Sequence, residues 1–210
     1  MRVAIIGSGI SGLYAAQQLH RHCDLTIFEA DSRPGGHSHT VDVAMDGKHL
    51  AMDTGFLVFN ERNYPHFTAL LKSLGVAYQP ADMSFSFRCA FRGLEYRGDT
   101  DFDAIFAQRR NLLRPGHYRM LLDILRFNRL GRAHLAAPAR HAWSLGDFLR
   151  THRFGDAFTG GYLLPMAAAI WSCPTATMAD FPATSFLRFF ANHGLLSVTG
   201  QPKWRTLRNR

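Results

Sequence analysis

Glycines recur at a fixed spacing near the N-terminus, where Gly7, Gly9 and Gly12 form the pattern G-x-G-x-x-G. This pattern follows a short apolar run and opens a helical one, which is typical of a turn that binds the pyrophosphate of a dinucleotide. Gly7 would allow the tight turn, Gly9 the close approach of the pyrophosphate, and Gly12 the packing of helix against sheet. The amides of Ile10 and Ser11 would face the phosphates at the helix start.

An acidic residue, Glu29, follows Gly12 by 17 positions and ends the second apolar run. A carboxylate at this point can accept hydrogen bonds from a ribose 2′-hydroxyl and would repel a 2′-phosphate. We therefore expect Glu29 to bind the adenosine ribose of a dinucleotide. The alternative is a structural glycine turn followed by an unrelated surface acid.

The stretch from Glu29 through Arg33, Gly35 and Gly36 resembles the E-x-x-x-R-x-G-G extension of FAD-binding flavoenzymes in the amine oxidase, protoporphyrinogen oxidase and phytoene desaturase superfamily. NAD enzymes usually lack this extension, which disfavours an NAD-dependent dehydrogenase. The resemblance implies that the glycine pair passes close to the FAD pyrophosphate. It also implies that a hairpin leads from there to a D-x-G segment near the flavin, here Asp53 to Phe56, so that Gly55 and Phe56 flank the cofactor.

The resemblance covers nearly the whole chain and looks closest to a bacterial branch described as predicted NAD/FAD-binding proteins. The segments that carry it are GGHSHTVDV, DTGFLVFN, FAQRRNLLRP, YLLPMAAAIWS and FPATSFLRFFANHGLLSV. It implies an FAD-dependent oxidoreductase with the isoalloxazine as hydride acceptor. The dense aromatic residues near the chain end are either plain core or the lining of a tunnel for an apolar or lipid-like substrate that loses hydride; they are Phe181, Phe186, Phe189 and Phe190. No residue is assigned as catalytic. His37 stands where typical amine oxidases have arginine, and we expect it beside the cofactor.

Two alternatives to this interpretation concern the same residues, and one further expectation concerns the chain end. A dinucleotide-binding module without catalysis is the second interpretation, which the early end of the sequence makes credible. His37 and His39 could form a metal pair, but no third ligand stands at a motif-like spacing, so we expect no metal site. Enzymes of the superfamily return to the nucleotide-binding domain after the substrate region, whereas this sequence ends at Arg210. We therefore expect a C-terminally truncated form that binds FAD weakly or not at all without the missing segment.

The elements that must position these residues can be read from periodicity. Strands over 2–6 and 25–28 enclose a helix over 10–22, which predicts the opening of a parallel doubly wound sheet. A hairpin is expected over 40–53 around Asp46-Gly47. From residue 63 helical patterns dominate, and helices are expected over 63–74, 117–130, 158–171 and 183–193. A further helix is expected to begin at Ser144 with a capping box, and one strand is expected within 84–91. The sequence predicts an α/β, Rossmann-like FAD/NAD(P)-binding segment over 1–60 and a mainly helical substrate segment over 61–210.

Composition and charge bound the remaining expectations. Cys23, Cys89 and Cys173 offer no disulfide framework, which favours a reducing cytoplasm. The uncharged run over 157–179 is interrupted by glycine and proline, so a buried helix is expected there rather than a membrane span. From Arg109 to Arg153 there are ten arginines and two acids. A solvated helix face, peripheral contact with an anionic membrane, and nucleic-acid binding are three interpretations, of which the last is disfavoured because stacking aromatics and known motifs are absent.

Overall fold

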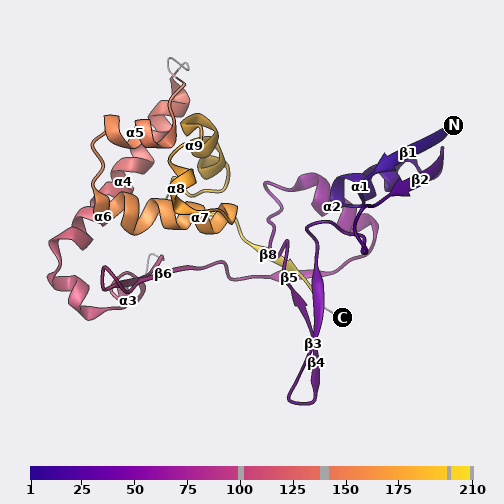
Figure 1. The fold of residues 1–210 in the computed structure, drawn as a ribbon, viewed down its shortest axis with the longest axis horizontal. Helices are drawn as coiled ribbons and strands as arrows, with labels where there is room; N and C mark the ends of the chain where they lie inside the picture. The colour runs from indigo at the N-terminus through magenta and orange to yellow at the C-terminus, as the bar shows by residue number, and fades with distance from the viewer. Residues whose placement is uncertain (99–101, 138–141, 198–199, 209–210) are drawn as a thin grey trace. The chain divides into compact units, whose positions relative to one another are not determined.

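The computed structural model describes residues 1–98, 102–137, 142–197 and 200–208. The chain folds as two compact units. Unit 1 comprises Met1–Asp82 and the chain from Lys203 onward, and unit 2 comprises Met83–Pro202. Each unit is built from its own helices and strands, most of which Figure 1 labels.

Unit 1 opens with the predicted strand–helix–strand motif. β1 (Arg2–Ile6) and β2 (Asp24–Phe28) pair in parallel from Arg2↔Asp24 to Ile6↔Phe28, and α1 (Ile10–Leu19) connects them. The predicted helix over 10–22 ends three residues early, because the chain must turn before it enters β2. The α/β, Rossmann-like fold class is thus confirmed.

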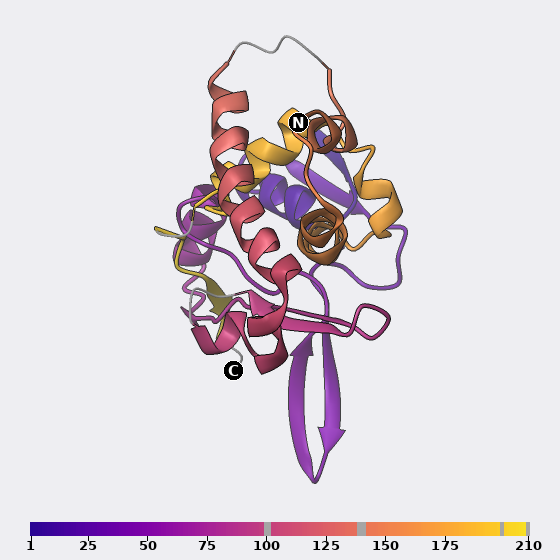
Figure 2. The same cartoon turned by 90° about the vertical axis from the view of Figure 1, so that its left-hand side faces the viewer.

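The predicted hairpin is also confirmed. β3 (Thr40–Met45) pairs antiparallel with β4 (Lys48–Asp53), from Thr40↔Asp53 to Met45↔Lys48. Asp46 and Gly47 form the turn with φ of +52° and +73°. Two positive φ values give the turn the twist that a two-residue hairpin needs. The two strands stand out as a long ribbon in Figure 2.

The rest of unit 1 packs around Phe59, which is 1% exposed. α2 (Pro65–Ser73) supplies Phe67, whose ring centroid lies 5.1 Å from that of Phe59, and β5 (Tyr78–Pro80) supplies Tyr78 at 5.4 Å. β8 (Arg205–Leu207) pairs with β5. The division into compact units at residue 82 therefore differs from the segment boundary that we placed at residue 60, because α2 and β5 share the core of unit 1.

Unit 2 begins with a second hairpin. β6 (Phe85–Cys89) lies within the strand predicted over 84–91 and pairs antiparallel with β7 (Leu94–Gly98). The short helices α3 (Phe102–Ile105) and η1 (Arg109–Leu113) follow. The buried Tyr96 of β7 ties the hairpin to the helices, because its hydroxyl donates to the carbonyl of Gly161 at 2.7 Å.

The remaining regular elements in the described part of unit 2 are helices, as predicted. They are α4 (Pro115–Ala136), α5 (Leu145–Thr151), α6 (Asp156–Phe158), the π-helix η2 (Thr159–Leu163), α7 (Leu164–Trp171), α8 (Thr175–Met178) and α9 (Ala183–Asn192). α4 is longer than the predicted 117–130 and runs as one rod in Figure 2. The capping box is confirmed, since Ser144 Oγ accepts the Asp147 amide at 3.1 Å and the Asp147 carboxylate accepts the Ser144 amide at 3.0 Å.

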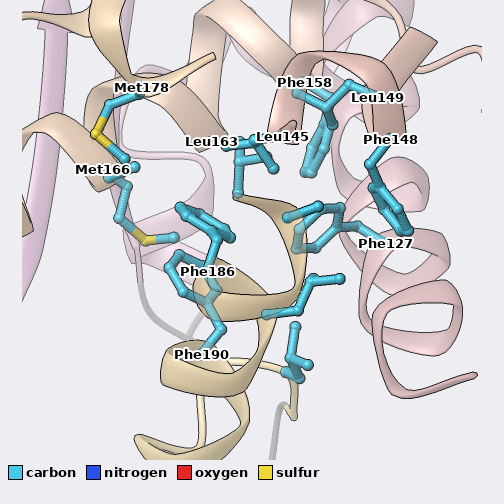
Figure 3. Packing of buried hydrophobic residues seen from close by; sticks show 14 residues of the cluster. Phe127, Leu145, Phe148, Leu149, Phe158, Leu163, Met166, Met178, Phe186 and Phe190 are labelled. Carbon is cyan, nitrogen blue, oxygen red and sulfur yellow. The ribbon is translucent and has the colours of Figure 1, made fainter. Parts of the chain in front are cut away.

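Phenylalanine, leucine and methionine side chains form the core of unit 2 (Figure 3). Phe127 from α4 lies between rings of other helices, with ring centroids 5.4 Å from Phe158 and 5.8 Å from Phe148. Phe186 and Phe190 of α9 stack at 4.2 Å and complete the cluster. None of the helices in the described part of the chain is long and apolar enough to cross a membrane.

Candidate dinucleotide site

The glycine turn between β1 and α1 has the geometry that its sequence predicts. Gly7 has φ of +89° and donates its amide to the carbonyl of Phe28 at 2.7 Å, which ties the turn to β2. Gly9 is the N-cap of α1 with φ of −70°, and a Cβ added there would meet no described atom within 4 Å. A Cβ at Gly12 would lie 2.0 Å from the carbonyl oxygen of Gly7. Only glycine lets the helix sit this close to the turn.

The start of α1 is open at the surface. Ile10 and Ser11 form the first helical positions, and both residues are exposed. Amides in the first turn of a helix have no acceptor within the helix, and the helix dipole makes this end attractive to anions. The turn therefore presents N–H groups to a phosphate, and the bare Gly9 leaves room for it to approach.

Glu29 is held at the end of β2 by four hydrogen bonds. Its Oε2 accepts from the Ser8 amide at 2.7 Å and from the Ser8 hydroxyl. Its Oε1 accepts from the amides of Ala30 at 2.8 Å and Asp31 at 2.9 Å. The Ser8 hydroxyl is the largest cause that lowers the pKa of Glu29 from 4.5 to about 2, and backbone amides add to it. The carboxylate is thus ionised and fixed beside the glycine turn.

The loop that contains Arg33, Gly35 and Gly36 folds back on the same turn. Gly35 donates its amide to the carbonyl of Ser8 at 3.0 Å. Gly35 and Gly36 have φ of +114° and +57°, and a Cβ on Gly36 would lie 3.0 Å from Cα of Gly9. The guanidinium of Arg33 donates to the carbonyls of Gly36 at 2.8 Å and Ser38 at 2.9 Å. The Arg33 side chain thus stabilises the loop by hydrogen bonds to backbone carbonyls of the same loop.

His37, Gly55 and Phe56 meet one step further along. Phe56 donates its amide to the carbonyl of His37 at 3.1 Å. A Cβ on Gly55 would lie 1.7 Å from the same carbonyl oxygen, so this crossing of two segments also requires glycine. The Phe56 ring is 41% exposed and rests edge-on against Phe67 of α2 at 5.6 Å. The twelve residues predicted to bind the cofactor thus form one chain of neighbours in unit 1.

A pocket of about 330 Å³ opens beside Glu29. Its walls combine apolar side chains, the carboxylate and the arginine loop, and they comprise Ser8, Leu13, Ile27, Glu29, Asp31, Ser32, Arg33 and Pro34. This mixture of apolar walls with a few directed polar groups suits a small ligand with a flat apolar part and a hydroxylated part. We did not predict Ser8 as a site residue from the sequence, although its position between two glycines of the turn places its side chain next to Glu29.

Histidine and acidic side chains do not gather into a metal site in the part of the chain that the structure describes. His39 Nδ1 instead lies 2.7 Å from the hydroxyl of Thr54, across the base of the β3–β4 hairpin. This contact joins the segment after the glycine pair to the D-x-G segment. It gives His39 a structural role in unit 1.

Comparisons with known proteins agree with this geometry. Residues 5–74 match the family model of the NAD(P)-binding Rossmann-like domain. Mitochondrial protoporphyrinogen oxidase of Nicotiana tabacum and protoporphyrinogen oxidase 2 of Arabidopsis thaliana are each 41% identical over 76 residues. That match covers 36% of this chain and 14% of either relative.

Solved structures extend the likeness to the fold of nearly the whole chain. Putrescine oxidase with bound putrescine aligns at a TM-score of 0.63 and 20% identity, over 99% of this chain and 46% of that chain. Cyclohexylamine oxidase from Brevibacterium oxydans aligns at 0.63 and 18%, over 98% of this chain and 45% of that chain. The chain thus spans less than half the length of these structures. The chain matches the NAD(P)-binding Rossmann-like model over residues 5–74, is similar in sequence to protoporphyrinogen oxidases over 76 residues, and shares its fold with part of putrescine oxidase and cyclohexylamine oxidase.

Proposed function

We propose that this chain binds FAD at the β1–α1 turn and belongs to an FAD-dependent oxidoreductase. The proposal rests on one observation: the glycine turn, the ionised Glu29 and the Gly35-Gly36 loop lie together. The amide of Gly35 donates to the carbonyl of Ser8, and the amide of Ser8 donates to Glu29. The open space at Gly9 fits a pyrophosphate that passes close to the backbone. The names of protoporphyrinogen oxidase, putrescine oxidase and cyclohexylamine oxidase support the same class of activity.

The residues of the chain would bind and orient the cofactor. Glu29 would accept hydrogen bonds from the adenosine ribose, and the amides of the glycine turn would hold the pyrophosphate. His37, Gly55 and Phe56 would flank the remainder of the cofactor. When bound, the flavin would supply a hydride acceptor. As a finer proposal, the substrate is apolar or lipid-like and loses hydride from a C–H bond.

Fluorescence titration of FAD with the full chain tests the proposed cofactor. We expect weak but saturable quenching of the flavin, reversed by ADP, because the chain spans less than half the length of the aligned oxidases. Glu29→Ala should weaken FAD binding by roughly tenfold or more, because it removes hydrogen bonds to a charged acceptor. Asp46→Ala in the distant hairpin turn serves as the matched control that removes one acid. Equal FAD affinity of wild type and Glu29→Ala would contradict the assignment.

A dinucleotide-binding module without catalysis is the second candidate, favoured by the match of residues 5–74 to an NAD(P)-binding family model. It predicts that NAD⁺ displaces ADP from the site while FAD does not. The FAD proposal predicts the reverse order. Competition of both dinucleotides against labelled ADP separates the two functions.

We also propose that unit 2 contacts an anionic membrane surface through α4. Tyr118, Leu122 and Leu125 follow one another on a single face of this helix, and the two leucines are 67% and 54% exposed. Arg119 and Arg129 are exposed on the same helix. Apolar side chains flanked by arginine are suited to the interface of a bilayer with acidic headgroups.

Co-sedimentation with phosphatidylserine-containing vesicles tests this contact, with phosphatidylcholine vesicles for comparison. Binding should require phosphatidylserine and should be lost when Leu122 and Leu125 are both replaced by Glu. Leu74→Glu, at an exposed leucine of unit 1, is the control. Binding that persists in the double variant would refute the proposal.

A reducing cytoplasmic location remains part of the proposal, supported by the free thiols of Cys23, Cys89 and Cys173.

A further inference from the structure

Ser8 makes the contact with Glu29 that the proposed cofactor site does not require. The residue is 3% exposed and lies between the glycines of the turn. Both its amide and its hydroxyl donate to Oε2 of Glu29. The other oxygen, Oε1, accepts from the amides of Ala30 and Asp31.

These four donors fill the acceptor capacity of the carboxylate. An ionised carboxylate offers about four lone-pair positions on its two oxygens. A ribose hydroxyl that donates to Glu29 must therefore replace one of the donors already present. Three of the four are backbone amides, fixed by the turn and by the end of β2. The Ser8 hydroxyl differs from them because it moves by rotation about one side-chain bond.

We propose that Ser8 is a positioning residue whose hydroxyl holds Glu29 in the free protein and yields its place on Oε2 to a ribose 2′-hydroxyl when the nucleotide binds. The exchange replaces one O–H···O⁻ hydrogen bond by another and moves no proton between oxygens. The amide of Ser8 keeps its own bond to Oε2 throughout. The pocket beside Glu29, which both Ser8 and Glu29 line, gives the ribose access to this oxygen. The inference rests on the proposed function and deepens it.

The exchange has a consequence that simple support of Glu29 does not have. In the wild type, a nucleotide without the 2′-hydroxyl loses little, because Ser8 still fills the acceptor position. In Ser8→Ala, water fills that position in the free protein, and the 2′-hydroxyl gains a hydrogen bond that no side chain competes for. The ratio of the Kd for 2′-deoxy-ADP to the Kd for ADP should therefore rise roughly fivefold in Ser8→Ala, the worth of about one hydrogen bond.

Isothermal titration of the full chain with ADP and 2′-deoxy-ADP tests the exchange. Ser8→Thr, which restores a hydroxyl, should keep the ratio at the wild-type value, and Glu29→Gln added to Ser8→Ala should return the raised ratio towards one. Ser73→Ala is the matched control, because it removes a serine hydroxyl that donates to the carbonyl of Leu70 at 2.8 Å in α2. Ser8→Gly removes the same hydroxyl and replaces Ser8→Ala if that variant does not fold.

The two levels of the proposal fail in different ways. If the wild type binds ADP and the hydroxyl-free variants leave the ratio unchanged or lower it, Ser8 only supports Glu29, and the exchange is refuted while the cofactor site stands. If folded wild-type protein does not bind ADP, the proposed function fails and the exchange fails with it.

Discussion

Replacement of Gly12 by alanine should destabilise unit 1, whereas replacement of Gly9 by alanine should keep the fold and abolish ADP binding. The added Cβ at Gly12 would lie 2.0 Å from the carbonyl oxygen of Gly7 and 3.2 Å from Cγ2 of Ile5. The first distance is about 1.5 Å inside the separation that non-bonded heavy atoms prefer. Overpacking usually costs about 1–3 kcal/mol. Because the obstructing atom belongs to the backbone of the turn, we expect the upper end, about 3 kcal/mol.

At Gly9 the same methyl group would meet no described atom within 4 Å, and the backbone has φ of −70°. Alanine is compatible with this conformation, and Gly→Ala at such sites changes the free energy of unfolding by less than about 1 kcal/mol. The methyl group would instead occupy the space proposed for the pyrophosphate. We therefore expect Gly9→Ala to keep the fold and to lose ADP binding.

Hydrogen exchange followed by mass spectrometry distinguishes the loss of stability expected in Gly12→Ala from the unchanged fold expected in Gly9→Ala. Peptides that cover β1, α1 and β2 should exchange roughly 100-fold faster in Gly12→Ala, as a loss of about 3 kcal/mol in local stability requires. In Gly9→Ala the same peptides should exchange at the wild-type rate. Wild-type protection in Gly12→Ala would refute the close packing of α1 against the turn. Wild-type ADP affinity in Gly9→Ala would refute the pyrophosphate path.

Three further predictions concern charge, packing and capping. Glu29 has its pKa lowered from 4.5 to about 2 by the Ser8 hydroxyl and backbone amides. As the pH falls, the Glu29 carboxylate is therefore protonated in the unfolded chain before it is protonated in the folded chain, and unit 1 should lose stability between about pH 4.5 and 2. Urea midpoints measured across this range should show the loss in the wild type and not in Glu29→Gln. Phe127→Ala should lower the free energy of unfolding of unit 2 by about 3–5 kcal/mol, measured by the fluorescence of Trp171, with Phe91→Ala at an exposed ring as the control. Ser144→Ala removes the cap of α5 and should cost about 1 kcal/mol in the same assay, and an unchanged midpoint would contradict the capping box.

The features that the sequence predicted correctly depend on local signals. The turn at Asp46-Gly47 requires two residues that accept positive φ, and the capping box at Ser144 and Asp147 requires a fixed spacing. Neither depends on distant parts of the chain. The glycine turn is similar, because Gly7 and Gly12 contact one another within six residues.

The features that were not predicted depend on contacts between distant segments. β8 pairs with β5 more than 120 residues earlier, and the carbonyl of Gly161 accepts the Tyr96 hydroxyl. No periodicity in either segment indicates its partner. The full set of donors to Glu29 was also missed, because the two amides that follow it and the Ser8 side chain converge only in three dimensions. The predicted site residues are placed together by the fold, and their individual roles stay predictions.

An amide chemical-shift titration of the full chain with ADP tests the dinucleotide site at the β1–α1 turn most directly. We expect saturable shifts confined to the glycine turn, the end of β2 and the loop at Gly35-Gly36, with the amides of Gly9, Ile10 and Asp31 among the largest. Shifts that cluster in unit 2, or none at all in the folded protein, would contradict a dinucleotide site at the β1–α1 turn.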